Sequence, residues 1–468
     1  VKILAAALNK KQVVVRVPVP DGAGGTTEVT DKVATAAAAQ KIQELTGAFE
    51  EWVPTNDNAS KVITDIYNQK FNSNVPRSFN GAHLTFPRLS GKYLLRGWQK
   101  DVVWRILQKG NTYMAHTVGA GKTLASIVAG MEMRRLGLAK KPAYVVLKST
   151  LTQFAAEYYD AYPDANILVA DEQKMDKKNR RQFLAQLAMG DWDAVIFTHE
   201  SFKEINMSAE YTQDYIQTEM DEYREMLDDV DKGDRITRRQ IENKLEKLNQ
   251  ELSGAANSKH LELTDFDFEE LGIDFLFVDE AHHHKKIPIV TEQGNIKGVP
   301  TDGSQRARDL LMKTQYLNTL RPGHHTVLMS GTPITNTMGE LYNIQRYLQP
   351  DVLAAGDIGS FDSWSSMFAD LETELEMQPN GSFKPVTRMK RFSNVSALMR
   401  DFLQVADIVD NAKLNESLEI ERPDIKDGAR KMEIVKSAPE MKEYQKELGV
   451  RITALEQKRG PPQKGDDN

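Results

Sequence analysis

Residues 116–123 read His-Thr-Val-Gly-Ala-Gly-Lys-Thr, a combination suited to binding phosphate. An apolar run precedes them and a helical run follows, which predicts a turn between a strand and the N-terminus of a helix. Backbone N–H groups at a helix start are unpaired, and the helix dipole adds partial positive charge. The turn therefore predicts a site for nucleotide phosphates. The strict pattern has glycine where His116 stands, which leaves a chance glycine-rich turn as the alternative.

The residues of this turn have separate predicted roles. Gly119 and Gly121 let the backbone approach the phosphates without a Cβ clash, and Ala120 lies between them in the same binding loop. Lys122 is predicted to reach the β- and γ-phosphates, and Thr123 to place a hydroxyl on Mg²⁺.

A second stretch places two adjacent acids at the end of a buried strand. Residues 275–282 read Phe-Leu-Phe-Val-Asp-Glu-Ala-His. Asp279 is predicted to hold Mg²⁺, a hard cation that prefers oxygen ligands, and Glu280 to orient and deprotonate the attacking water. The alternative is that both acids only cap a following helix. We reject a metal site for the run 282–284, because three adjacent histidines cannot all face one ion.

A third stretch, residues 329–336, reads Met-Ser-Gly-Thr-Pro-Ile-Thr-Asn and also follows a predicted strand. We expect Ser330, Gly331 and Thr332 to form a turn beside the acids that senses the γ-phosphate and relays its loss. Such a turn means little in isolation. In third place, after the phosphate loop and Asp-Glu-Ala-His, it is highly specific.

The elements that position these motifs form an alternating pattern from about residue 91. Short apolar, β-branched runs alternate with helices, which is typical of strands buried on both faces of a parallel sheet. The predicted strands are Thr112–Ala115, Ala143–Leu147, Ile167–Ala170, Ala194–Phe197, Phe275–Val278 and Thr326–Met329. The pattern predicts a doubly wound α/β domain that binds its ligand at the carboxyl ends of the strands.

One insertion interrupts this alternation at residues 206–265. Two apolar heptad stripes flank residues 232–234, and Thr237 with Gln240 forms a capping-box pattern for the second stripe. The first stripe is Ile216, Met220, Tyr223, Leu227 and Val230; the second is Ile241, Leu245, Leu248 and Leu252. An antiparallel helical hairpin is predicted, and we favour packing of the two stripes on each other over a binding role.

Composition shifts divide the chain into four predicted regions. These are a mainly helical leader at 1–90, a ligand-binding lobe at 91–350, a helical extension at 351–430 and a final stretch at 431–468. Residues 18–30 are predicted to be a Pro/Gly/Thr linker. In the extension, helices are predicted from the apolar stripe Phe361–Leu375 and over 394–409, and residues 457–468 are predicted to be disordered.

The overall composition limits the classes of function. At 468 residues the chain is too long for one core, which predicts two or three domains. The absence of cysteine excludes disulfides and fits a reducing cytoplasm. The net charge of -7 argues against indiscriminate coating of nucleic acid. No stretch is apolar enough to span a membrane. Because the chain begins with Val1, we expect a fragment or a processed product.

The order of these motifs resembles the first RecA-type lobe of a superfamily-two helicase, most closely the Swi/Snf-like translocases, which tolerate a residue other than glycine at position 116. The resemblance covers roughly residues 90–350 and is also carried by 95–99, 145–151, 197–202 and 330–350. It implies ATP and Mg²⁺ as cofactors, and recognition of adenine by Gln99.

The same resemblance implies DNA as a partner. Lys148, Ser149, Thr198 and His199 are implied to contact a phosphate backbone, and such contacts position the protein without reading sequence. Two basic clusters leave DNA contact and an ordinary solvated face as open alternatives. They are Arg306 with Arg308 and Lys313, and Arg388 with Lys390 and Arg391.

A narrower resemblance connects the chain with very large helicase–methyltransferase proteins of phages and mobile elements, some of which are DarB-like antirestriction proteins. It is carried by residues 71–84, 190–196 and 345–350. It implies the cytoplasm of a bacterial host, with possible virion association, and a methyltransferase region of the same polypeptide as a partner. Methylation is not assigned to this chain, because we find no tetrapeptide of the methyltransferase type.

Residues 433–444 resemble the opening of a second RecA lobe, which is otherwise missing. That lobe would supply an arginine finger, so the fragment is expected to bind ATP and hydrolyse it poorly by itself. The leading hypothesis is an ATP-dependent DNA translocase or helicase motor. The alternative is a nucleotide-gated structural or DNA-binding module of a restriction, antirestriction or virion assembly.

Overall fold

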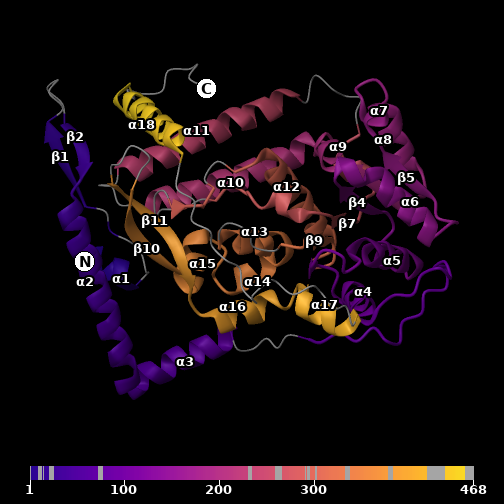
Figure 1. The fold of residues 1–468 in the computed structure, drawn as a ribbon, viewed down its shortest axis with the longest axis horizontal. Helices are drawn as coiled ribbons and strands as arrows, with labels where there is room; N and C mark the ends of the chain where they lie inside the picture. Colours follow the sequence, from indigo (N-terminus) through magenta and orange to yellow (C-terminus); the bar gives the residue numbers. More distant parts are fainter. Residues whose placement is uncertain are drawn as a thin grey trace.

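The largest sheet among the described residues has seven parallel strands. Figure 1 shows it in the right half of the molecule. The computed structural model describes residues 2–8, 13, 15–20, 26–71, 77–229, 235–258, 266–289, 291, 296–300, 303–332, 338–377, 383–418 and 438–458. The strand order is β12-β3-β9-β7-β4-β6-β5. The strands are β3 (Thr112–His116), β4 (Pro142–Val146), β5 (Ile167–Ala170), β6 (Ala194–Thr198), β7 (Phe275–Val278), β9 (Thr326–Met329) and β12 (Ala406–Val409). All six predicted strands are present.

In six of the seven strands, all except β12, alternate residues enter two different apolar cores. Tyr113 and Ala115 of β3 belong to one core, whereas Met114 belongs to the other. The second core also takes side chains from α4 (Gly97–Lys109), α5 (Lys122–Arg135) and α6 (Leu151–Ala161). The first takes side chains from α8 (Arg180–Met189), α12 (Gln305–Leu320) and α13 (Gly339–Leu348). Helices therefore cover both faces of the sheet, which confirms the predicted doubly wound α/β fold.

The N-terminal region is less uniformly helical than predicted. It contains α1 (Lys2–Leu8), β1 (Arg16–Pro20), β2 (Thr26–Thr30), α2 (Lys32–Trp52), the 3₁₀ turn η1 (Val53–Thr55) and α3 (Asp57–Phe71). The linker prediction for 18–30 is wrong, because β1 and β2 pair antiparallel there; residues 21–25 lie outside the described part. Figure 1 shows α1, α2 and this strand pair along the left edge, away from the large sheet.

The inserted hairpin is confirmed. Its arms are α10 (Ala209–Asp229) and α11 (Arg235–Ser258), and they share a core of their own. That core consists of Ile216, Met220, Tyr223, Ile241 and Leu248, flanked by Met226, Leu227, Leu245 and Leu252. Both heptad stripes therefore pack against each other as predicted; Val230 and residues 232–234 lie outside the described part.

The region after residue 350 departs most from the prediction. Helix α14 (Pro350–Ala355) and helix α15 (Phe361–Phe368) precede β10 (Ala369–Met377), which pairs antiparallel with β11 (Phe383–Phe392), and β11 also pairs with β8 (Ile296–Lys297). The predicted helix through Leu375 is therefore wrong beyond Phe368. Leu-Glu-Thr-Glu-Leu alternates with a period of two, and Leu371 and Leu375 fit a strand as well as a helix.

The predicted helix over 394–409 is also corrected. It divides into α16 (Val395–Phe402) and β12, and β12 pairs with β3 in the main sheet. The sheet domain therefore extends beyond the predicted boundary at residue 350. Helices α17 (Asn411–Leu418) and α18 (Pro439–Lys458) follow, while residues 433–435 and the tail after Lys458 lie outside the described part.

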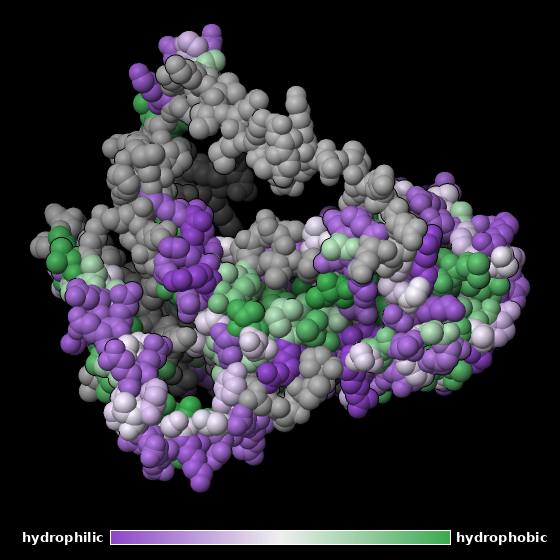
Figure 2. All heavy atoms as spheres, turned by 60° about the horizontal axis from the view of Figure 1, so that its bottom comes forward, coloured by the Kyte–Doolittle hydropathy of each residue, from purple (hydrophilic) through white to green (hydrophobic). Residues whose placement is uncertain are grey.

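The surface is mostly hydrophilic with a few apolar patches. Figure 2 brings the bottom of Figure 1 forward and shows hydrophobic side chains gathered between hydrophilic areas. Several large exposed apolar side chains belong to α2 and α3, among them Phe49, Trp52, Val62 and Ile66. None of the described helices is long and apolar enough to cross a membrane.

Candidate nucleotide-binding site

The predicted turn between a strand and the N-terminus of a helix is present in the structure. Strand β3 ends at His116 and α5 begins at Lys122, with the loop between them. Gly119 has φ 86° and Gly121 has φ 76°, both in the left-handed region that favours glycine. A Cβ on Gly121 would overlap the amide of Gln99, whereas a Cβ on Gly119 would meet nothing within 4 Å. The loop is therefore packed on the Gly121 side and open at Gly119.

The ammonium of Lys122 lies against the loop. Its Nζ donates hydrogen bonds to the backbone oxygens of His116 at 3.0 Å and Thr117 at 3.4 Å. Thr123 follows in the first turn of α5, where the backbone N–H groups have no partner within the helix. A cation and unpaired N–H groups thus meet at one helix N-terminus, an arrangement that favours an anion.

Helix α4 supports the second half of the loop through two side chains. The indole of Trp98 donates to the backbone oxygen of Ala120 at 3.0 Å, and Nε2 of Gln99 donates to that of Gly121 at 3.1 Å. Oε1 of Gln99 accepts from the backbone N–H of Arg96 at 2.9 Å, and Gln99 is only 5% exposed. Gln99 is therefore a support of the loop, a role that the sequence did not suggest, and base recognition stays a prediction. The sequence also did not predict that Trp98 supports the loop. The only sequence signal for this role was its position next to Gln99.

The three predicted motifs meet at one edge of the sheet. Strands β3, β9 and β7 are consecutive neighbours and run parallel, so their carboxyl ends lie together. The backbone N–H of Ser330 donates to the oxygen of Met114 at 3.2 Å. A Cβ on Gly331 would lie 3.4 Å from Cγ2 of Val118 and 3.6 Å from the backbone oxygen of His116. The turn from Ser330 to Thr332 therefore touches the phosphate loop; residues 333–336 lie outside the described part.

Asp279, the first acid of the second motif, lies where its charged form is disfavoured. Burial raises the pKa of Asp279, the neighbouring Glu280 raises it further, and the ammonium of Lys122 opposes both effects. Lys122 and Asp279 therefore act on each other across the site. Glu280 has φ 45°, and its carboxylate lies 2.9 Å from Nδ1 of His282. Glu280 occupies the N-cap position of η4 (Ala281–His284) without a side-chain capping bond, which argues against the helix-cap alternative.

The three consecutive histidines have different surroundings. His282 contacts Glu280, His283 is exposed, and His284 is buried with its Nε2 2.8 Å from Nδ1 of His199. Burial lowers the pKa of His199 to about 4 and that of His284 well below its usual range. The two buried rings are therefore neutral near pH 7, and the contact joins η4 to α9 (His199–Lys203).

The residues implied to contact DNA separate into two groups. Lys148 and Ser149 are exposed on η2 (Lys148–Thr150), which follows β4, and Lys148 forms an ion pair with Glu172 of α7 (Glu172–Met175). Thr198 is 4% exposed and His199 is 2% exposed. The Thr198 hydroxyl caps α9 by accepting the N–H of Ser201 at 3.0 Å. Both side chains are enclosed in this structure, so neither is accessible to a phosphate backbone.

The basic cluster on α12 serves the fold. Arg308 bonds to Glu219 of α10 and Glu251 of α11, each at 2.6 Å. Lys313 is fully buried, 2.8 Å from Asp309, and Arg306 pairs with Glu200 at 3.0 Å. Each cation has a carboxylate partner, which favours a structural role over a DNA-contact surface. The second cluster lies on β11, where Arg388 pairs with Glu376, and Lys390 and Arg391 pair with Glu372 of β10.

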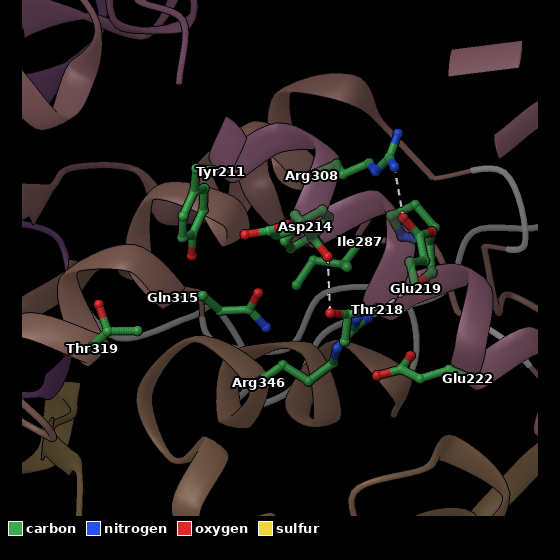
Figure 3. A pocket seen from close by; sticks show the side chains of 12 residues that line it. Tyr211, Asp214, Thr218, Glu219, Glu222, Ile287, Arg308, Gln315, Thr319 and Arg346 are labelled. Carbon is green, nitrogen blue, oxygen red and sulfur yellow. Dashed lines mark hydrogen bonds and ion pairs between the residues drawn. The ribbon is translucent and has the colours of Figure 1, made fainter. Parts of the chain in front are cut away.

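A cavity of about 310 Å³ lies away from the phosphate loop, between the inserted hairpin and helices α12 and α13. Figure 3 shows Arg308 pointing towards Glu219 on one side, with Arg346 and Glu222 on the other. The lining contains none of the phosphate-loop or acidic-motif residues, so this cavity and the candidate nucleotide site are separate features.

Comparison with known proteins gives two kinds of relative. Defense against restriction protein B of Escherichia phage P1 is 23% identical over 406 residues, which cover 77% of this chain and 18% of that protein. A SWI2/SNF2 ATPase core from Sulfolobus solfataricus in complex with dsDNA is 17% identical with a TM-score of 0.34, covering 61% of this chain and 40% of that one. The SWI2/SNF2 ATPase core domain from the same organism is 16% identical with a TM-score of 0.37, covering 73% and 50%.

Family models match two parts of the chain. Residues 1–73 match a domain of unknown function, and residues 104–409 match a family described as a probable helicase domain. The helicase match ends at the last residue of β12, in agreement with the extended sheet. Together with the antirestriction relative, it confirms the resemblance that the motifs predicted. Because this match spans more than half of the sequence, the chain belongs to the probable helicase domain family.

Proposed function

We propose that the chain is the ATP-binding lobe of a DNA-translocating motor of the helicase type. The observation that carries the proposal is the meeting of three motifs around one helix N-terminus. Lys122 is the first residue of α5, which follows β3. Asp279 follows β7 and Ser330 follows β9, and β9 lies between β3 and β7 in the sheet. A phosphate-binding cation, a carboxylate and a hydroxyl turn at one sheet edge are suited to nucleotide hydrolysis.

The residues present fit a nucleotide with Mg²⁺. The loop offers left-handed glycines and unpaired N–H groups to phosphate, and the pKa of Asp279 is raised by burial and by Glu280, a tension that a divalent cation relieves. No group of three metal-binding side chains is present among the described residues. Mg²⁺ is commonly held by one or two carboxylates together with substrate phosphates, which is what Asp279 and the hydroxyl of Thr123 can provide.

In this proposal each site residue has one task. ATP supplies the phosphoanhydride bond. Lys122 binds its β- and γ-phosphates, and Glu280 orients the attacking water once its carboxylate leaves His282. Ser330 to Thr332 report the state of the γ-phosphate, and Lys285 connects this turn with α13 because its Nζ donates to the oxygen of Thr332 at 2.9 Å and to Glu340 at 3.1 Å.

DNA is the proposed partner of the same sheet edge. Lys148 and Ser149 are exposed there and are suited to contact the DNA phosphate backbone without sequence preference. Thr198 and His199 are buried beneath this edge and support it. A second RecA lobe with an arginine finger, and a methyltransferase region, are proposed to belong to the same polypeptide, since the chain spans 18% of its phage relative. The bacterial cytoplasm is the proposed location.

ATP hydrolysis by the full-length polypeptide tests the proposal. Turnover is measured without DNA, with single-stranded DNA and with double-stranded DNA. We expect DNA to raise turnover. Lys122→Ala should weaken ATP binding at least about tenfold, and Glu280→Gln should lower kcat by about 10² or more at unchanged ATP affinity, the scale of general-base catalysis. Lys178→Ala, an exposed lysine on the segment between α7 and α8, is the control and should match the wild type.

Two outcomes decide against the motor. If DNA leaves turnover unchanged and neither site substitution lowers it, nucleotide hydrolysis is not performed by these residues. If ATP binds with full affinity while DNA stimulates little turnover, the nucleotide-gated structural or DNA-binding module takes its place.

A further inference from the structure

His116 occupies the position where the strict phosphate-loop pattern has glycine, and its side chain is fully buried. Its Nε2 lies 2.8 Å from Oδ1 of Asp407, 291 residues away in the chain. We propose that this pair is a positioning device for nucleotide binding, which fixes the start of the phosphate loop against β12. The inference rests on the proposed function. It assigns a role to Asp407, which lies outside the motif, and to the histidine that replaces the first glycine of the motif.

The backbone explains why histidine is accepted here. His116 is the last residue of β3 and stands opposite Val409 in the parallel register of β3 with β12. An extended strand residue needs no positive φ, so glycine has no conformational advantage at this position. Strand β12 packs beside β3 at this point, and its Asp407 is the hydrogen-bond partner of the imidazole.

The pair is the first of three ties between the loop and the segment of β12 and α17. The backbone N–H of Thr117 donates to the oxygen of Val409 at 2.9 Å, and its hydroxyl donates to Oδ1 of Asn411 at 3.0 Å. Val409 also shares a small apolar core with Trp98, Ala120 and Leu414. The loop is therefore held from α4 on one side and from β12 and α17 on the other.

The position of Lys122 depends on this hold. The two oxygens that accept hydrogen bonds from its Nζ belong to His116 and Thr117, the residues tied to β12 and α17. A shift of either residue would displace the ammonium that is proposed to bind phosphate. Nδ1 of His116 is buried without a hydrogen-bond partner, so removal of Asp407 would leave both ring nitrogens of a buried imidazole unsatisfied.

Substitutions at Asp407 test the inference through the Kd for MgATP and the kinetic constants of the full-length polypeptide. Asp407→Ala is expected to raise Kd and KM about tenfold with kcat within about twofold, the scale of one lost charge-assisted hydrogen bond. Asp407→Asn keeps an oxygen that accepts from Nε2–H and should restore most of the affinity. Ile408→Thr, an exposed position on the same strand, is the control.

Substitutions at His116 give a second, independent test. Glutamine places its amide nitrogen near the position of Nε2, whereas asparagine places it near Nδ1 and cannot reach Asp407. We therefore expect His116→Gln to bind MgATP within about threefold of the wild type and His116→Asn about tenfold more weakly, with similar thermal unfolding. This comparison decides the question if Asp407→Ala does not fold.

The outcomes separate this inference from the proposed function. If the wild type and Lys122→Ala bind MgATP equally weakly, the proposed function fails and the positioning role fails with it. If Lys122→Ala loses affinity while folded Asp407→Ala and His116→Asn bind like the wild type, only the positioning role is overturned. The positioning role alone is also overturned if His116→Gln and His116→Asn lose affinity for MgATP equally.

Discussion

One buried carboxyl group, that of Asp401, contributes to the pH dependence of the stability of the sheet domain. Asp401 is buried in α16, just before the strand that carries Asp407. Desolvation raises its pKa from 3.8 to about 6, and the nearby Arg400 opposes this only in part. A folded-state pKa above the unfolded value means that the folded protein holds this proton more tightly. The stability contribution of Asp401 is therefore most favourable below pH 4 and is lost as the pH rises to about 6.

Asp401→Asn is expected to stabilise the protein at pH 7.5 by on the order of 2 kcal/mol and to have little effect at pH 4, because the amide is neutral at both pH values. Denaturant unfolding at the two pH values measures the difference. Asp65→Asn changes an exposed carboxylate on α3 and should show no such pH-dependent gain. An Asp401→Asn variant with equal effects at pH 4 and pH 7.5 would contradict the burial argument.

Residue types and spacing predict which residues gather at the candidate site better than they predict the residues that support it. Lys122, Thr123, Asp279 and Glu280 lie at one sheet edge because their motifs follow strands, a local pattern that sequence reveals. The enclosure of His199 depends on His284, 85 residues away, and the support of His116 depends on Asp407. Such long-range contacts have no local signature, so the burial of His199 could not be predicted from the sequence.

At the scale of elements, the fit of α5 on the sheet depends on one glycine. Gly130 lies in the middle of α5, and a Cβ there would overlap the hydroxyl of Tyr144 on β4. That hydroxyl donates to the backbone oxygen of Ser126 one turn earlier in α5, at 3.2 Å. The absence of a side chain at position 130 lets the helix that begins at the phosphate loop approach the strand closely.

Gly130→Ala is expected to destabilise the fold by about 1–3 kcal/mol through overpacking, although alanine is the better helix former. Adding Tyr144→Phe removes the overlapping hydroxyl and should recover part of the loss, as measured by denaturant unfolding of both variants and of Tyr144→Phe alone. Gly254→Ala on α11, where a Cβ meets nothing within 4 Å, should instead stabilise by about 0.5–1 kcal/mol. A stabilising Gly130→Ala would contradict the close approach.

Element prediction failed where two periodicities coincide. Leu371 and Leu375 fit a helix and a strand equally, and the neighbouring Glu372 pairs across β10 and β11 with Lys390 and Arg391. Strand β12 has only four residues, one of them Asp407, and its apolar pattern is too short to distinguish from a helix end. Its place in the sheet follows from pairing with β3, which only the folded chain shows.

At the scale of the whole molecule, the inserted hairpin has a small core of its own beside the sheet domain. Arg308 of α12 bonds to both arms, through Glu219 of α10 and Glu251 of α11. These two carboxylates raise the pKa of Arg308 against the desolvation that lowers it. One guanidinium thus closes the hairpin and fixes it beside the cavity of Figure 3.

Arg308→Met should loosen the hairpin while leaving the sheet domain folded. Methionine keeps the volume of the side chain but leaves Glu219 and Glu251 without their shared cation, at a cost of about 1.5–3 kcal/mol for partly buried charged hydrogen bonds. Hydrogen exchange should therefore quicken along α10 and α11 and stay unchanged in β3 and α5, because the hairpin has its own core. Arg224→Met removes an exposed ion pair with Asp221 on the same hairpin and should change exchange very little. Equal exchange in both variants would mean that apolar contacts, such as that of Tyr211 with Tyr316, hold the hairpin in place.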